Sequence, residues 1–399
     1  MFEKELIPLL QTHQTPFYLF DAGDLKQRIR FLRALLPEQV ELCYALKANP
    51  FLAREVSPLV ERLELCSPGE YAICDQLDLP PSQFVISGVY KDPAWLQDLV
   101  ARRGEAMIFT VESLQQYELL RHAAQVTGKK LSLLLRLTSG NQFGLEKTEL
   151  ENLFALHRHS DRLEIRGVQY FSGTQKTSLK RLAKELATLD DFLAHLQQSL
   201  GVPIGELEFG PGFPIDYFDQ PDPQAEEAFL RQAAALFAQM NYQGKVVLEL
   251  GRSIAATCGR YVTKVVDRKT NGGQNYAIVD GGIHQLVYYG QSLAMHRPPV
   301  TAFPLRKGEP LQKWNICGAL CTINDLLVKQ LPLPDLRLGD ALIFDRAGAY
   351  CMTEGIALFL SRDLPKILLR QEDGQVCTLR CPQPIHSLNT PHYDSKEDN

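Results

Sequence analysis

The sequence predicts a protein of the α/β class in which a (β/α)8 TIM-like barrel is joined to a second, mostly β domain. Three observations lead to this prediction. The chain has 399 residues, which suits a barrel of about 250 residues plus a domain of about 100–150. Short apolar segments recur between residues 41 and 251, with longer amphipathic segments between them. Beyond residue 260, polar and apolar residues alternate in the manner of half-exposed strands.

The apolar segments are expected to be parallel strands. Strands buried on both faces read as continuous apolar runs, and the helices that connect them read as amphipathic. Ser178–Gln198 is one such helical segment, with apolar residues three or four positions apart. Eight strand–helix units predict a closed barrel, with an open doubly wound sheet as the main alternative. The expected strands are Glu41–Lys47, Arg62–Cys66, Phe84–Ser87, Ala106–Thr110, Leu131–Leu137, Ile165–Phe171, Glu206–Phe209 and Lys245–Leu250.

The second domain is expected to combine both ends of the chain. Its strand-like segments are YVTKVV, QNYAIVDGG, KWNICG, DLRLGDALIF, KILLRQ and GQVCTLR, separated by turn signals such as Asn271-Gly272-Gly273 and Gly339-Asp340. The predicted boundaries are 26–260 for the barrel, and 1–25 with 261–383 for the β domain. The polar stretch 384–399 is expected to be a flexible tail.

Composition and charge exclude several classes of function. The formal net charge is -5 and no long Lys/Arg run occurs, so no nucleic-acid partner is expected. No apolar run approaches the roughly 18 residues that span a bilayer, and the first twenty residues lack the apolar core of a signal peptide. Nine cysteines without a regular framework predict reduced thiols in the cytoplasm. Neither close pair, 317/321 nor 377/381, has a second pair or His cluster beside it, so no metal site is expected.

The unusual residues fall at strand ends, where a (β/α)8 barrel places its chemistry. Lys47 ends the first expected barrel strand, either as a solvated rim residue or as a residue used in chemistry. Glu249 ends the eighth, where a buried acid is costly unless paired. Its partner could be Arg252 or another base, or a pyridine nitrogen that it holds protonated. A protonated pyridine ring is the electron sink of pyridoxal 5'-phosphate (PLP), which stabilises a carbanion formed by loss of CO2 or a proton.

A possible phosphate site follows the seventh and eighth expected strands. Barrels frequently bind phosphate there through exposed backbone N–H groups. The GPG tripeptide at 210–212 allows close backbone approach, although Pro211 donates no N–H, and Arg252 could bind phosphate oxygens bidentately. A lone GPG is usually only a turn. Together with Lys47 and Glu249 it favours a PLP site in which Lys47 carries the cofactor as a Schiff base.

These residues together resemble the fold-type III PLP decarboxylases, the group that contains diaminopimelate, ornithine and arginine decarboxylases. The resemblance runs over nearly the whole chain, with seven motifs in the family's order. YALKANP is similar to the Schiff-base lysine motif, LCSPGEY to the second-strand motif and GVQYFSGTQ to the histidine–glycine–serine motif. FGPGFPIDY is similar to the glycine loop, ELGR to the glutamate–proline–glycine–arginine motif, CGALCTIND to the cysteine–aspartate motif and GAY to the late tyrosine motif.

The resemblance implies roles for individual residues. Lys47 would form the Schiff base and Glu249 would bind the pyridine nitrogen. The phosphate would be held by Gly210, Gly212, Arg252 and Tyr350, with Thr174 nearby. Cys321 and Asp325 would enter the site from the partner subunit of a homodimer, Cys321 to protonate the carbanion and Asp325 to lie near the substrate. Cys321 could instead be a buried core thiol, Tyr350 a packed aromatic and Arg136 either a pocket residue or a salt-bridge partner.

The departures from the family pattern bear on substrate. Phe171 stands where the family places a histidine flat against the PLP ring; an aromatic ring can still stack, without the polar edge. Leu250 replaces the proline of the arginine motif, with little expected effect. Thr322 replaces the acid that follows the cysteine in diaminopimelate decarboxylases, and Val287-Tyr288-Tyr289 replaces an arginine–proline segment. A zwitterionic distal centre needs both an acid and an arginine, so diaminopimelate is a poor candidate.

The leading hypothesis is a PLP-dependent α-decarboxylase in a specialised biosynthetic pathway, similar to those of antibiotics and siderophores. Its amino-acid substrate would be carrier-tethered or condensed, with an uncharged or long far end facing Tyr288-Tyr289. The second hypothesis is a decarboxylase of free ornithine, lysine or diaminopimelate, in which Asp325 binds a distal ammonium. An amino-acid racemase generally pairs the ring nitrogen with arginine, which Glu249 argues against. A catalytically silent PLP-binding regulatory relative tends to lose the lysine or phosphate ligands, which this chain keeps.

Overall fold

The structure is a computed structural model that describes residues 2–157, 161–201, 204–218, 222–292 and 294–392. These residues form two compact units. The barrel unit comprises Lys26–Ile215 and Asp222–Ile254, and the sheet unit comprises the described parts of Met1–Leu25, Asp216–Pro221 and Ala255–Asn399. Each unit is described separately.

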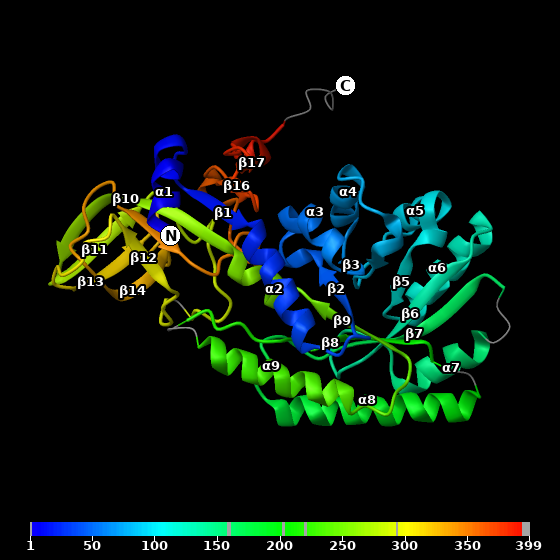
Figure 1. Ribbon diagram of the computed structural model, residues 1–399. Helices are drawn as coiled ribbons and strands as arrows, with labels where there is room; N and C mark the ends of the chain where they lie inside the picture. Colours follow the sequence, from blue (N-terminus) through cyan, green and yellow to red (C-terminus); the bar gives the residue numbers. More distant parts are fainter. Residues whose placement is uncertain (1, 158–160, 202–203, 219–221, 293, 393–399) are drawn as a thin grey trace, which may run out of the picture. The chain divides into compact units, whose positions relative to one another are not determined.

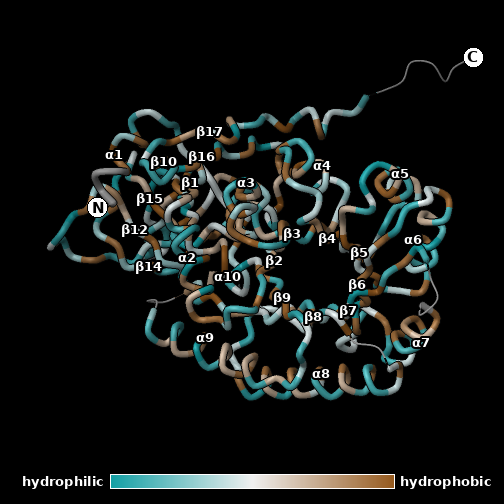
Figure 2. Tube along the Cα trace, turned by 45° about the vertical axis from the view of Figure 1, so that its right-hand side comes forward, coloured by the Kyte–Doolittle hydropathy of each residue, from teal (hydrophilic) through white to brown (hydrophobic). Residues whose placement is uncertain are grey.

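The barrel unit is a closed ring of eight parallel strands, and Figure 2 shows the ring with helices around it. The ring closes where β2 pairs with β9, which places Cys43 beside Glu249. The predicted closed barrel is therefore confirmed over the open sheet. The strands are β2 (Glu41–Ala45), β3 (Arg62–Leu65), β4 (Phe84–Ile86), β5 (Ile108–Val111), β6 (Leu131–Leu137), β7 (Leu163–Phe171), β8 (Glu206–Gly210) and β9 (Lys245–Leu250).

Helices lie between these strands, with α2 before β2 and α10 after β9. The helix α8 buries one stripe of leucines and Phe192, and it lies beside α9 (Figure 1). Several helices begin at a Ser or Asp whose side chain accepts a backbone N–H of the first turn, as Ser178 does from Arg181. The helices are α2 (Ala22–Leu35), α3 (Ala53–Val56), α4 (Pro68–Gln76), α5 (Pro93–Arg103), α6 (Leu114–Thr127), α7 (Lys147–His157), α8 (Leu179–Leu200), α9 (Pro223–Ala238) and α10 (Arg252–Ala255). Short 3-10 turns are η1 (Leu46–Ala48), η2 (Pro50–Leu52), η3 (Ser57–Leu59), η4 (Pro81–Gln83) and η5 (Gly104–Ala106).

The interior of the barrel has an apolar part and a polar part. The apolar part is a cluster of Cys43, Val85, Ile108, Leu134 and Val247. The polar part, which we call the polar interior, consists of Arg62, Glu64, Gln169, Glu206, Glu208 and Glu249, all at least nine-tenths buried. Arg62 on β3 binds Glu206 on β8 although these strands are not neighbours in the ring, so the contact crosses the interior.

The sheet unit contains one mixed sheet in the order β14-β13-β11-β10-β1-β16-β17, with β15 pairing with β10 and β12. The central strand β1 is antiparallel to β10 and parallel to β16. Of these strands, β1, β12 and β14 were not predicted, and the expected strand DLRLGDALIF is a strand only at its end. The strands are β1 (Phe17–Asp21), β10 (Gly259–Asn271), β11 (Gln274–Val279), β12 (Val300–Phe303), β13 (Gln312–Cys317), β14 (Leu326–Leu333), β15 (Ala341–Phe344), β16 (Lys366–Arg370) and β17 (Val376–Arg380).

One helix and three short turns complete the sheet unit. They are α1 (Phe2–Thr12), η6 (Ala256–Cys258), η7 (Phe359–Ser361) and η8 (His386–Asn389). The turn η8 lies in the segment expected to be a flexible tail, and residues 393–399 of that segment lie outside the described residues. The helix α1 packs Leu6 and Leu9 onto the sheet.

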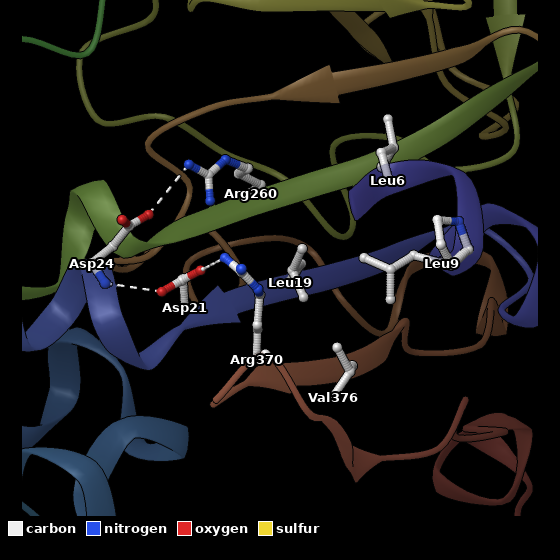
Figure 3. A pocket seen from close by; sticks show the side chains of 10 residues that line it. Leu6, Leu9, Leu19, Asp21, Asp24, Arg260, Arg370 and Val376 are labelled. Carbon is white, nitrogen blue, oxygen red and sulfur yellow. Dashed lines mark hydrogen bonds and ion pairs between the residues drawn. The ribbon is translucent and has the colours of Figure 1, made fainter. Parts of the chain in front are cut away.

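A cavity of about 380 Å³ lies in the sheet unit (Figure 3). Leu6, Leu9 and Leu19 form part of its apolar wall. Two ion pairs form its other side: Arg370 Nη1 is 2.9 Å from Asp21 Oδ2, and Arg260 Nη2 is 3.3 Å from Asp24 Oδ2. Each charged group in this wall is thus matched within the sheet unit itself.

The described residues contain neither a membrane-spanning helix nor a cluster of metal-ligating side chains. No helix among them is long and apolar enough to cross a membrane. No group of three or more His, Cys, Asp or Glu side chains among them is arranged to hold a metal ion.

Candidate active site

Lys47 lies just past the C-terminal end of β2, in the turn η1. Its neighbours Leu46 and Ala48 are buried. Asn49 supports the next turn, because its side-chain oxygen accepts the N–H of Phe51 at 3.0 Å. The Lys47 side chain is 41% exposed.

Two buried carboxyl groups approach the amine of Lys47. Lys47 Nζ is 2.6 Å from Glu64 Oε2 and 3.5 Å from Glu249 Oε1. The thiol of Cys66 also lies 3.5 Å from Nζ. The arrangement is a primary amine between two acids on β3 and β9, at the end of the barrel where such folds carry their chemistry.

The two acids differ in proton affinity. Burial raises the pKa of Glu249 to about 7, the negative charge of Glu64 adds to this rise, and Lys47 opposes it. Burial also acts to raise the pKa of Glu64, but the charge and hydrogen bond of Lys47 prevail and lower it to about 2. Glu64 is therefore the ion-pair partner of Lys47, whereas Glu249 can hold or release a proton near neutral pH.

Gln169 on β7 binds the carboxylate oxygen of Glu249 that does not face Lys47. Its Nε2 donates a hydrogen bond of 2.9 Å to Glu249 Oε2. Both side chains are buried, with Gln169 1% exposed. Because β8 separates β7 from β9, this bond passes over β8 inside the barrel.

The loops after β7 and β8 form a tight backbone cradle. Gly212 has a φ of 62°, and a Cβ there would lie 2.2 Å from the carbonyl oxygen of Gly173. Lys176 N donates to Gly212 O at 2.9 Å, and the Gln175 side chain binds both the N–H and the C=O of Ile215. A Cβ at Gly173 would meet nothing within 4 Å, so the backbone there is open to close approach.

Phe171 and Gly210 lie in direct contact. A Cβ on Gly210 would lie 2.3 Å from Cδ2 of the Phe171 ring. The ring therefore needs a glycine at position 210. Phe171 is half-buried at the end of β7, which places an aromatic face beside the cradle.

Two arginines were expected at the site. Arg252 is buried and begins α10 directly after β9 and Gly251. Arg136 on β6 forms an ion pair with Glu112, with Nη1 3.0 Å from Oε2, and its guanidinium lies 4.7 Å from the centre of the Phe143 ring. Arg136 was expected to be either a pocket residue or a salt-bridge partner, and it forms the salt bridge.

Of the remaining expected residues, Thr174 lies in the barrel unit, in the loop after β7, and the others belong to the sheet unit. Asp325 is 3% exposed, and its carboxylate accepts the N–H groups of Ile283 at 2.8 Å and Leu320 at 2.7 Å. Burial raises the pKa of Asp325, and these two bonds oppose the rise. Cys321 is exposed and not the buried core thiol of the alternative reading. Tyr350 is half-buried and has a left-handed φ of 64°.

Three residues near the Lys47 amine and Glu249 were not predicted from the sequence: Glu64, Cys66 and Gln169. Glu64 could have been found by the argument that found Glu249, since it is also an acid in an apolar strand. Gln169 carries no charge, and its place beside Glu249 depends on the pairing of β7 with β8. No local pattern in the sequence indicates that pairing register.

A lysine between two acids, two glycine-rich loops and a buried arginine fit the groups of PLP: an aldehyde, a pyridine nitrogen and a phosphate. Residues 17–348 match the family model described as pyridoxal-dependent decarboxylase, C-terminal sheet domain. The chain belongs to this family. This pyridoxal-dependent decarboxylase uses PLP and is a carboxy-lyase that acts on an amino-acid substrate.

Two curated relatives illustrate the range of the pyridoxal-dependent decarboxylases similar to this chain. The diaminopimelate decarboxylase of Aquifex aeolicus is 28% identical, over 86% of this chain and 83% of the relative. The L-glutamyl-[BtrI acyl-carrier protein] decarboxylase of Niallia circulans is 24% identical, over 92% of each chain. The crystal structure of diaminopimelate decarboxylase from Helicobacter pylori complexed with L-lysine has the same fold, with a TM-score of 0.82, 23% identity, and 96% and 98% coverage of this and that chain.

Proposed function

We propose that Lys47 binds PLP covalently and that Glu249 is the partner of its ring nitrogen. The observation that carries this proposal is the position of the Lys47 amine between Glu64 and Glu249, at 2.6 and 3.5 Å. The two glycine loops and Arg252 would hold the phosphate, with Thr174 in the first loop and Tyr350 as a further ligand. Phe171 would contact the face of the ring.

When bound, PLP supplies a protonated pyridine ring that accepts the electron pair left by the departing carboxylate. Three side chains of the protein are proposed to assist this step, by holding a proton, by positioning the amine and by delivering a proton. Glu249 holds a proton at the ring nitrogen, because its pKa of about 7 lets it share one at neutral pH. Glu64 holds the Lys47 amine in place as an ion pair. Cys321, which is exposed in the single chain, is proposed to deliver the proton to Cα from the partner subunit of a homodimer.

The proposed substrate is an amino acid that is carrier-tethered or already condensed into a larger intermediate, in a specialised biosynthetic pathway. Two features support this class. Thr322 offers no charge to a distal group, and the similarity to a carrier-protein decarboxylase extends over 92% of the chain. Of the tyrosine pair, Tyr288 is buried and donates to Asp345 O at 2.6 Å, so only the 47% exposed Tyr289 can meet a substrate.

A second candidate is the decarboxylation of free ornithine, lysine or diaminopimelate. The identity of 28% with a diaminopimelate decarboxylase favours it. In this reading Asp325 binds the distal ammonium, with the lone pairs that its two backbone N–H bonds leave available. The free thiols of the chain suit the cytoplasmic location that we propose for either function.

CO2 release by the PLP-loaded enzyme separates the two candidates. The panel contains free ornithine, lysine, arginine, diaminopimelate and glutamate, together with carrier-tethered aminoacyl thioesters. Turnover of tethered substrates alone is the expected result. Fast turnover of a free diamino acid would establish the second candidate instead, and an Asp325→Asn variant with a raised KM would then identify the anchor. Lys47→Ala is the control and should release no CO2 from any substrate.

A further inference from the structure

The polar interior of the barrel contains more acids than cations. Four carboxyl groups there are at least nine-tenths buried: Glu64, Glu206, Glu208 and Glu249. Lys47 pairs with Glu64, and Arg62 pairs with Glu206 through contacts of 2.7 and 3.1 Å. Glu249 faces the proposed cofactor position, which leaves Glu208 as the carboxyl group with the least compensation. A buried charge that is not compensated is avoided by taking up a proton.

Glu208 is completely buried on β8. Its Oε2 lies 3.3 Å from Arg62 Nη1, and its Oε1 has no hydrogen-bond partner among the described residues. The charged groups that face it are Arg62 and Glu64 from β3, Glu206 from its own strand and Glu249 from β9. Burial raises the pKa of Glu208 to about 8, and the three carboxyl groups add to this effect against Arg62.

Gln169 is the neighbour of Glu208 in the pairing of β7 with β8. Its Nε2 donates to Glu249, while its Oε1 is buried and, within the described chain, accepts no hydrogen bond. Two buried oxygens, on residues that are neighbours across the pairing of β7 with β8, are therefore unsatisfied among the described residues. A carboxylic acid can donate a hydrogen bond to an amide oxygen, whereas a carboxylate cannot. One proton on Glu208 would satisfy both atoms at once.

We propose that Glu208 is a neutral carboxylic acid that positions Glu249 through Gln169. Its hydroxyl donates to Gln169 Oε1, and this holds the amide N–H groups toward Glu249. Donation from Gln169 stabilises the ionised form of Glu249. The effect on catalysis rests on the proposed role of Glu249 as the partner of the ring nitrogen. The protonation of Glu208 itself does not.

The protonated acid can be observed directly in the PLP-loaded enzyme. The infrared C=O stretch of a carboxylic acid is distinct from that of a carboxylate. The difference between wild type and Glu208→Gln should contain this band at pH 6, and the band should disappear as the pH rises through about 8. If the difference spectrum holds no such band at pH 6, Glu208 is ionised and the proposal is wrong.

Substitutions test the positioning role. Glu208→Gln keeps a donor for Gln169 and should retain PLP with less than about a threefold change in Kd. Glu208→Leu and Gln169→Leu remove the link. Each should weaken PLP binding about tenfold or more, since a buried polar group loses its partner. They should also shift the pH profile of the bound cofactor's visible absorbance. Leu134→Ala, in the apolar part of the same interior, is the matched control for general damage.

The outcomes separate this proposal from the proposed function. A Glu208→Leu enzyme with wild-type Kd and an unchanged absorbance profile would overturn the positioning role. The same losses in Leu134→Ala would overturn it as well, because they would reflect general packing. If Glu249→Gln leaves the absorbance profile unchanged, the role of Glu249 is wrong, while the infrared band of Glu208 would still be present.

Discussion

Arg62 and Glu206 form an ion pair across the inside of the barrel, with Arg62 Nη2 2.7 Å from Glu206 Oε2. They come from β3 and β8, which are separated in the ring by β2 and β9. Arg62 also lies 3.3 Å from Glu208. One guanidinium therefore contacts two buried acids and forms its shorter ion pair with Glu206.

Removing this guanidinium should destabilise the protein strongly. Arg62→Met leaves Glu206 without its partner, and breaking a buried pair from one side costs about 3–5 kcal/mol. Urea unfolding would measure the loss. Arg102→Met is the control, because it breaks an exposed pair with Asp98, and such pairs contribute about 0–1 kcal/mol. If both variants lose a similar amount of unfolding free energy, burial of the Arg62–Glu206 pair does not increase the cost of breaking it.

The stability of the cofactor-free protein should depend on Glu249 over a defined pH range. Its folded pKa of about 7 lies above the ordinary value of 4.5. The folded state thus binds this proton more tightly than the unfolded state, and the free energy of unfolding falls as the pH rises from about 4.5 to 7. Glu249→Gln should remove this contribution to the fall, as measured by Tm at a series of pH values.

Glu208→Gln provides the matched comparison for that experiment. Because the pKa of Glu208 is raised to about 8, its contribution should continue to fall up to about pH 8 and not stop near 7. Glu64 acts in the opposite direction. Its pKa is lowered to about 2, so its stabilising contribution is lost as the pH falls from about 4.5 to 2. If the Tm of Glu249→Gln and that of the wild type depend on pH in the same way, the raised pKa of Glu249 is refuted.

Glu249→Gln should also impair catalysis more than cofactor attachment. The amide cannot hold a proton at the ring nitrogen as a carboxylate does, and loss of a positioned acid–base group costs about 10²–10⁴-fold in rate. Borohydride reduction followed by peptide mapping should still find the cofactor on Lys47. A variant within threefold of the wild-type kcat would contradict the role of Glu249.

A methyl group at Gly212 should disrupt the proposed phosphate cradle. Gly212 has positive φ, and its Cβ would lie 2.2 Å from the carbonyl oxygen of Gly173. Gly212→Ala should therefore raise the Kd for PLP about tenfold or more. Gly140→Ala is the control: its φ is also positive, but its Cβ would meet nothing within 4 Å. It should cost only about 1 kcal/mol in stability and leave PLP affinity unchanged.

The barrel was predictable because its strands are buried on both faces and therefore read as apolar runs. The sheet unit was harder. β14 contains Pro332, which a strand tolerates only where no N–H is needed, and β14 is at an edge of the sheet order. The strands β1 and β12 have five and four residues, too few for an alternating pattern to be distinct.

Parts of the candidate site were beyond prediction from sequence for a different reason. Lys47 and Glu249 stand at strand ends, where a charge is conspicuous. The links between Gln169, Glu208 and Arg62 depend on which side chains meet across the ring. That is decided by the register of β7 with β8 and by the closure of β2 on β9, and neither leaves a trace in the local pattern.

The central place of β1 in its sheet has a consequence for biosynthesis. Phe17 pairs with Val262 on one side and with Lys366 on the other. Because β1 is synthesised before both of its partners, both of its edges are covered only after the residues of β16 have been made. Until then it is a short apolar ribbon with open hydrogen-bonding groups, which chaperones and other nascent chains can bind. Shortened chains that end before residue 366 should accordingly be prone to aggregate during synthesis.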